Sequence, residues 1–124
     1  MVLDHARFAD VVVVAPKGRV DHATSESLRE ALAPFLARCT AAGDRVVLDL
    51  AGVEYISSAG LRVLMLAAKQ ARVQQGFFAV AAARPLVLEI LEISKFTLVL
   101  RTLSSVRDAV AAASPAGLAA FERG

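Results

Sequence analysis

Apolar residues along this chain fall into short continuous runs and helical repeats, and the two patterns alternate. The runs at Val11–Ala15, 46–50 and 77–82 leave no side of the chain for water, apart from the single Asp49 in the second run. Such runs predict strands that are buried on both faces. Their alternation with helical repeats is typical of an α/β domain with a largely parallel sheet and right-handed crossovers.

Four helices are expected from apolar residues that recur every three or four positions and from the residues that precede them. The first helix begins at Thr24 or Ser25, and the second covers residues 58–74 and is ended by Gly76. The third covers residues 86–93 after Pro85. The fourth begins at Ser104 or Ser105 and ends near Ala113. Pro34 lies inside the first repeat, which predicts a kink or an early end there.

Two short strands complete a sheet of about four to five strands. One begins at Arg19 and ends at Asp21, and the other covers residues 97–100. The turn-forming residues 114–117 then interrupt the pattern. We therefore expect residues 1–113 to form a single domain and residues 114–124 to form a tail that frays or packs as one loose turn.

Composition agrees with one small domain. The chain has 124 residues, enough for one core and too few for two. Its hydrophobic share of 56% with only 6% aromatic residues predicts a core of Val, Leu and Ala. The 14 basic and 12 acidic residues are spread along the chain without a basic cluster, so nucleic acid is not an expected partner.

The expected location is the cytoplasm, without direct contact with a membrane. No apolar run approaches the roughly 18 residues that cross a bilayer. The first seven residues lack the basic and apolar regions of a signal peptide. The single Cys39 cannot form an internal disulfide, which agrees with a reducing compartment.

An enzyme is not expected. A catalytic serine needs a base within reach, and the only histidines are His5 and His22; only a His22 placed against Ser58 would favour catalysis. No glycine-rich loop with a lysine is present to hold phosphates, and the aspartates lack metal-ligand spacing. The sequence therefore predicts neither a cofactor nor a metal.

Two adjacent serines, Ser57 and Ser58, stand directly before the second helix. A hydroxyl at this position can accept hydrogen bonds from the free N–H groups of the first turn, where the helix dipole also favours negative charge. From the residues alone the pair is a capping sequence, with either serine as the cap.

Two markers in this sequence resemble those of STAS-domain anti-sigma-factor antagonists. In that family a serine at a helix start is phosphorylated by a partner kinase. The first marker is the run Asp49-Leu50, six connecting residues, and then Ser57-Ser58-Ala59-Gly60-Leu61. The second is a small strand that ends in Asp and leads into a helix, Gly18-Arg19-Val20-Asp21-His22-Ala23-Thr24-Ser25. The markers occur in the family's order, and the resemblance covers residues 8–110.

The resemblance implies a phosphorylation switch at Ser58. Ser57 is the alternative, because it replaces an Asp that the family often carries there. The implied partners are an anti-sigma serine kinase of the histidine-kinase-like ATPase type and a PP2C-like serine phosphatase that restores the free form. The resemblance also implies that Asp21 helps the kinase bind or orient Ser58, whereas turn and cap chemistry explains Asp21 equally well.

The expected partner-binding surface is the exposed side of the second helix. A phosphate on Ser58 would suit the helix start but would be costly at an interface, so it should release the partner. The residues expected at this surface are Asp21, Thr24, Ser57, Gly60, Arg62, Met65 and Lys69. Gly60 would let a partner backbone approach closely. A solvated face explains Arg62 and Lys69 equally well, and Thr24 is most simply a helix cap.

Two further functions stay open from the sequence. One is a constitutive STAS docking subunit of an ABC-type lipid or solute transporter, in which the serine is only a cap. The other is a sensor that binds a nucleotide or another ligand, although no loop in the sequence predicts such a site.

Overall fold

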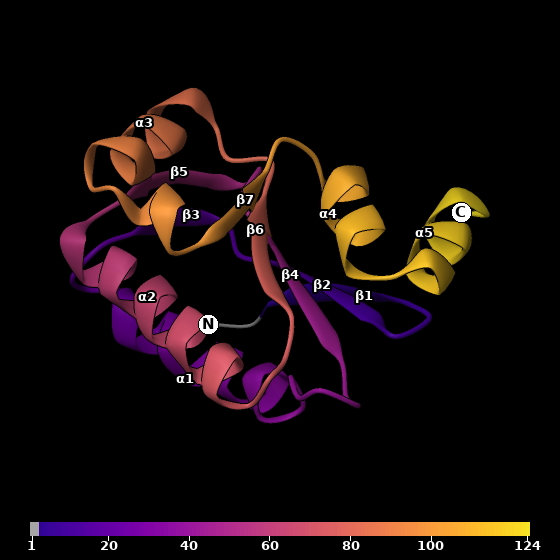
Figure 1. Ribbon diagram of the computed structural model, residues 1–124. Helices are drawn as coiled ribbons and strands as arrows, with labels where there is room; N and C mark the ends of the chain where they lie inside the picture. Colours follow the sequence, from indigo (N-terminus) through magenta and orange to yellow (C-terminus); the bar gives the residue numbers. More distant parts are fainter. Residues whose placement is uncertain (1–2) are drawn as a thin grey trace.

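A five-stranded mixed sheet forms the centre of the molecule (Figure 1). The computed structural model describes residues 3–124. In spatial order the strands are β1 (Asp4–Phe8), β2 (Val11–Ala15), β4 (Arg45–Asp49), β6 (Phe78–Ala81) and β7 (Arg101–Leu103). Only β1 and β2 pair antiparallel, and the other neighbours are parallel. The predicted α/β class with a mostly parallel sheet is confirmed, and β4 is the central strand as expected.

A second, two-stranded sheet lies beside the first. It pairs β3 (Gly18–Val20) with β5 (Val53–Ile56) in parallel, with Val20 opposite Ile56. The strand expected to begin at Arg19 is therefore present, but it does not join the central sheet.

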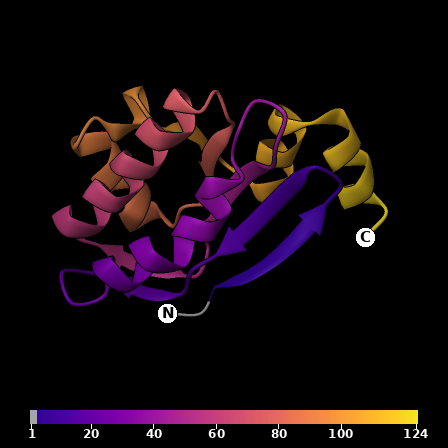
Figure 2. The same ribbon diagram turned by 90° about the horizontal axis from the view of Figure 1, so that it is seen from below.

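Helices cover both faces of the central sheet (Figures 1 and 2). The helical elements are α1 (Ser25–Ala37), α2 (Ser58–Val73), α3 (Pro85–Ile93), the short 3-10 helix η1 (Phe96–Leu98), α4 (Val106–Ala113) and α5 (Pro115–Glu122). α1, α2 and α3 lie on one side of the sheet, and α4 and α5 lie on the other. The result is a three-layer arrangement with the sheet in the middle.

Alternating side chains of the buried strands divide the core between the two faces. Val12, Val46 and Leu48 belong to the larger cluster, which also holds buried apolar residues of α1, α2 and α3. Val11, Val13 and Val47 belong to the smaller cluster, which α4 and α5 cover. Because side chains of a strand alternate between its faces, a run that is apolar at every position fits a sheet covered on both sides.

The end of α2 depends on a residue that the sequence pattern did not single out. Gln75, with φ of 61°, takes the left-handed position that usually belongs to glycine at a helix end. Its N–H donates to the carbonyl of Arg72, and the N–H of Gly76 donates to that of Ala71. Gly76 follows the turn, and a Cβ there would lie 2.3 Å from the carbonyl oxygen of Cys39. Gly76 is thus required by close packing rather than by its backbone angles.

Two sequence-based expectations and one half of a third are wrong in their local structure. Residues 97–100 do not form a strand: Phe96–Leu98 is a 3-10 helix, and the strand begins at Arg101. The segment expected to be a loose tail forms the helix α5, which packs against β1 and α4. α1 continues past Pro34 to Ala37, so of the two alternatives expected at this proline, a kink or an early end, the early end is excluded.

The described residues contain no helix that is both long and apolar enough to cross a membrane.

Candidate functional site

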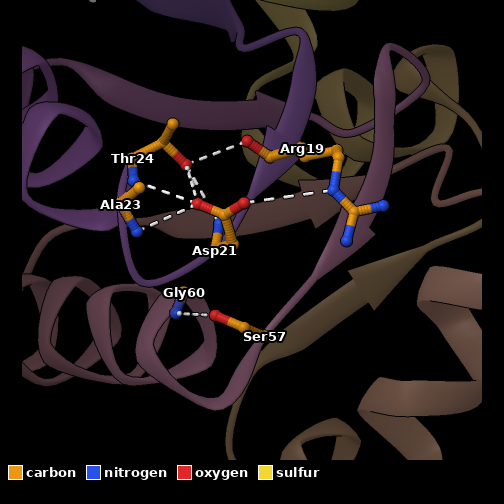
Figure 3. Close-up of polar contacts among 6 residues, drawn as sticks. All are labelled: Arg19, Asp21, Ala23, Thr24, Ser57 and Gly60. Atoms are coloured by element: carbon orange, nitrogen blue, oxygen red, sulfur yellow. Dashed lines mark hydrogen bonds and ion pairs between the residues drawn. The ribbon is translucent and has the colours of Figure 1, made fainter.

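The candidate site lies where β3 and β5 end side by side (Figure 3). Because the two strands are parallel, their carboxyl ends meet, and the chain leaves them as Asp21 and Ser57. The backbone N–H of Ser57 donates to the carbonyl of Val20 over 2.8 Å, which extends the pairing by one residue. The strand-end Asp and the start of α2 are therefore brought together, as the sequence predicted for the two markers.

The Asp21 carboxylate organises the turn into α1. Its Oδ1 accepts hydrogen bonds from the N–H groups of Ala23 at 3.0 Å and Thr24 at 3.1 Å. This arrangement is the turn that an Asp side chain forms with backbone groups two and three residues on. The carboxylate is half-buried, and its Oδ2 lies 3.9 Å from Nε of Arg19, too far for a hydrogen bond.

Thr24 stands at the cap position of α1, but its side chain does not cap the helix. Its hydroxyl donates to the carbonyl of Arg19 over 2.9 Å and accepts from the N–H of Asp21 over 3.0 Å. These bonds fix the turn that precedes α1 and leave the hydroxyl unavailable to the first helical N–H groups. The expectation that Thr24 is a helix cap is therefore corrected: Thr24 braces the loop that carries Asp21.

Arg19 belongs to this cluster although the sequence analysis assigned it no role. Its guanidinium carbon lies 4.5 Å from the ring centroid of Tyr55, a cation–π contact between paired residues of β3 and β5. Residues two apart on a strand share a face, which places Arg19 near Asp21. The spacing of Arg19 and Asp21 was the signal in the sequence that could have identified this neighbour.

The two serines at the start of α2 have different roles. Ser57 is the N-cap: its backbone is extended and its Oγ accepts from the N–H of Gly60 over 3.3 Å. Ser58 is the first residue of the helix and is exposed. Within residues 3–124, its hydroxyl forms no hydrogen bond. The structure therefore resolves which serine is the cap, a point that the residues alone left open.

Gly60 serves the interior of the chain and not an open surface. It is buried, and a Cβ at this position would lie 2.7 Å from Cγ1 of Val20 and 2.8 Å from Cγ1 of Ile56. Such approaches are closer than packed carbon atoms allow. The expectation that Gly60 lets a partner backbone approach is therefore wrong, because the close approach is to β3 and β5.

The outer side of α2 carries the other residues that were expected to meet a partner. Arg62 and Lys69 are exposed, and Met65 between them is half-buried. Leu66, beside Met65, is 46% exposed. Among the described residues, neither Arg62 nor Lys69 forms an ion pair, so this side of the helix is an accessible surface of mixed charged and apolar character.

The described residues show no arrangement of a base against Ser58. The His22 side chain is exposed and forms no hydrogen bond with Ser58 in this part of the chain. Residues 3–124 also contain no group of three or more His, Cys, Asp or Glu side chains placed to hold a metal ion.

Comparison with known proteins identifies the family. The family model described as "Mlab, STAS domain" matches residues 4–102. The protein named "Putative anti-sigma factor antagonist BtrV" of Bordetella bronchiseptica is 40% identical over 113 residues, which cover 91% of this chain and 94% of the relative. The chain belongs to the STAS-domain family of anti-sigma-factor antagonists. The resemblance found in the two sequence markers is thus confirmed.

Solved structures share the fold of this STAS domain. An anti-sigma factor antagonist from Mycobacterium paratuberculosis matches with a TM-score of 0.80 and 22% identity, covering 90% of this chain and 92% of that one. SpoIIAA in its unphosphorylated form matches with a TM-score of 0.68 and 13% identity over 88% and 93% of the two chains. The phosphorylated form of the Bacillus protein matches with a TM-score of 0.65 and 12% identity over 91% and 100%. At these identities the likeness establishes the fold.

Proposed function

We propose that this STAS domain is a phosphorylation-controlled switch that binds an anti-sigma serine kinase when Ser58 is free and releases it when Ser58 is phosphorylated. The observation that carries the proposal is the difference between the two serines. Ser57 uses its hydroxyl to cap α2, whereas Ser58 is exposed and its hydroxyl is uncommitted within the described residues. A kinase can reach Ser58 without breaking the helix cap.

The start of α2 suits a phosphate. Backbone N–H groups and the helix dipole give this end a partial positive charge, and the first turn of α2 contains no acidic residue. Arg62 lies four residues after Ser58, one helical turn away and exposed. A phosphate on Ser58, with about −1.5 to −2 charges, therefore adds no strong repulsion within the domain.

The same phosphate opposes a bound partner. A charge enclosed at an interface loses its water, and this cost exceeds the gain unless the partner supplies a matching charge. Phosphorylation of Ser58 thus weakens binding to α2 while the fold stays intact. In agreement with this view, the structural relative SpoIIAA is known in both a phosphorylated and an unphosphorylated form.

In this proposal Asp21 orients the kinase or the Ser58 hydroxyl. Oδ1 of Asp21 is occupied by the turn, whereas Oδ2 accepts no hydrogen bond within residues 3–124. Asp21 therefore has one acceptor atom left for a donor that the partner brings to the edge where β3 and β5 end.

The proposal can be tested by phosphorylation with the cognate kinase and ATP, followed by phosphate-affinity electrophoresis. Wild type and Ser57→Ala should both shift, and Ser58→Ala should not. A shift of Ser58→Ala equal to that of wild type would refute the assignment to Ser58.

Copurification tests the partner. A small histidine-kinase-like ATPase recovered with the domain supports the switch, and a PP2C-like phosphatase should remove the phosphate. Recovery of an ABC-type ATPase instead would support the alternative of a constitutive transporter docking subunit.

A further inference from the structure

A second site candidate lies far from Ser58, at the amino ends of β4, β6 and β7. A cleft of about 400 Å³ opens there between the last turn of α2, the loop that leads into β6 and the end of α4. This volume is within the range of small-molecule binding sites. Ser58 is the first residue of α2 and Arg72 is in its last turn, which separates them by about 20 Å along the helix. The cleft is therefore distinct from the site described above.

Three arginines line the cleft, and none of its lining residues is acidic. Arg45 comes from β4, Arg72 from α2 and Arg101 from β7. Arg45 is partly neutralised, because its guanidinium forms an ion pair with Asp10 over 2.8 Å. Neither Arg72 nor Arg101 forms an ion pair with a residue in the described part of the chain. Within residues 3–124, the cleft thus carries two arginines that have no ion-pair partner.

Arg101 is held in place by an aromatic ring. Its guanidinium carbon lies 4.7 Å from the ring centroid of Phe77, within the range of a cation–π contact. This contact restricts a long side chain without using its N–H groups as hydrogen-bond donors. An anion that binds Arg101 therefore meets a guanidinium that has already lost part of its conformational freedom.

The end of α2 accounts for Arg72 but not for Arg101. A basic residue in the last turn of a helix can compensate the helix dipole, and Arg72 stands in that turn. Arg101 comes from β7, so the helix end gives no reason for a second arginine in the cleft.

We propose that this cleft binds a small organic phosphate, with its phosphate group between Arg72 and Arg101. Planar guanidinium groups donate paired hydrogen bonds to phosphate oxygens, a geometry that favours phosphate over a single point charge. Val99, which is 43% exposed, and the Phe77 ring line the same cleft and offer apolar contact to the organic part. Because Ser58 is at the opposite end of α2, a ligand in this cleft would not contact Ser58.

The test is an NMR titration of the ¹⁵N-labelled domain with pyrophosphate, ADP and GDP at fixed ionic strength. We expect saturable shifts at Arg72, Phe77 and Arg101, with a dissociation constant below about 1 mM for at least one ligand. Arg72→Gln and Arg101→Gln should each weaken binding by about fivefold or more. Arg123→Gln, which removes an exposed arginine at the end of α5, is the matched control and should bind like wild type.

The outcomes separate the possible sources of the phosphate group and the possible failures. Tighter binding of ADP or GDP than of pyrophosphate supports an organic phosphate. Equal affinity for pyrophosphate and ADP would overturn the role given to the organic part and leave recognition of the phosphate alone. Absence of saturation at millimolar ligand overturns the proposal. So does wild-type affinity in both glutamine variants, provided that their well-dispersed spectra show that they are folded. Binding of an acidic peptide in place of all three phosphates would also overturn it. Ser58→Ala should leave the titration unchanged, so this test does not depend on the switch.

Discussion

The Oγ of Ser57 accepts a hydrogen bond from the N–H of Gly60 over 3.3 Å, which makes Ser57 the N-cap of α2. Ser57→Ala removes this acceptor and should destabilise the domain by about 1 kcal/mol. The expected effect is a fall in melting temperature of about 3–6 °C. Thermal unfolding followed by circular dichroism measures it.

Ser58→Ala is the matched control for the cap. It removes the same atom one residue later, where the hydroxyl forms no hydrogen bond within residues 3–124, so its melting temperature should stay within about 1 °C of wild type. A larger loss of stability from Ser58→Ala than from Ser57→Ala would contradict the assigned roles.

Gly60→Ala should destabilise the domain, although alanine normally stabilises a helix relative to glycine. The added Cβ would meet Val20 and Ile56 at less than 3.0 Å, so β3, β5 or α2 must shift. We expect a cost of about 1–3 kcal/mol in urea unfolding.

A double-mutant cycle isolates this contact. Val20→Ala removes the nearest methyl group, and Gly60→Ala should therefore cost less in a Val20→Ala background than in wild type. Strictly additive effects would show that the cost of Gly60→Ala has another origin.

Asp21→Asn separates the structural role of Asp21 from its proposed role toward the kinase. Asparagine keeps an Oδ1 that can accept from Ala23 and Thr24, so the turn and the melting temperature should be preserved. Loss of the charge should slow phosphorylation of Ser58, by about tenfold if Asp21 orients the reaction. Initial rates with the cognate kinase measure this effect.

Asp21→Ala provides the comparison, because it removes both the charge and the acceptor. It should slow phosphorylation and also lower the melting temperature. If Asp21→Asn is phosphorylated at the wild-type rate, the role of Asp21 is limited to the turn before α1.

Several elements of the fold could be predicted because their pattern has a direct physical cause. The apolar runs became β2, β4 and β6, since a sheet covered on both faces buries side chains on both faces of its central strands. β1 was missed because its residues at 4–7 are exposed, and an edge strand needs no apolar pattern.

The C-terminal helix α5 was missed because Ser114 and Pro115 were interpreted as helix breakers. In the structure the Oγ of Ser114 accepts from the N–H of Gly117, and Pro115 occupies the first turn. Serine followed by proline is also a helix start. A tertiary contact decides between a helix break and a helix start: the hydroxyl of Ser114 donates to the carboxylate of Asp10, 104 residues earlier, over 2.6 Å. No local pattern reveals such a bond.

At the site, the sequence predicted which residues lie together but not the structural role of each one. The two markers placed Asp21 and the serines together correctly, because parallel strands end at a common edge. The partners of Thr24 and the burial of Gly60 depend on how β3 and β5 pack against α2. Neither spacing nor residue type determines those contacts.

The ion pair between Arg7 and Asp44 predicts how the domain responds to acid. Arg7 donates two hydrogen bonds of 3.0 Å to the Asp44 carboxylate, which lowers the pKa of Asp44 below its ordinary value. A lowered pKa in the folded state stabilises the fold above the ordinary value of about 3.9. This contribution is lost as the pH falls further, through the pKa of the folded state.

Asp44→Asn removes this contribution. Between pH 5 and pH 3, a range around the ordinary carboxyl pKa of about 4, its free energy of unfolding should therefore fall less than that of wild type. Urea midpoints at each pH measure the difference. Glu26→Gln is the comparison. Arg29 also lowers the pKa of Glu26, but this i,i+3 pair is exposed and screened by solvent, so the profile of Glu26→Gln should differ from wild type less than that of Asp44→Asn. Identical profiles for wild type and Asp44→Asn would show that the pKa of Asp44 is the same in the folded and the unfolded state.

The central claim is that a phosphate on Ser58 releases the partner without unfolding the domain. The most direct test is the dissociation constant of the cognate anti-sigma kinase for the unmodified and the Ser58-phosphorylated domain, measured by calorimetry beside the melting temperature of each form. We predict binding that is weaker on the order of 100-fold after phosphorylation, within the range typical of coupled sites, at a melting temperature that is nearly unchanged. Equal dissociation constants for the two forms, or release only through loss of the fold, would contradict the account.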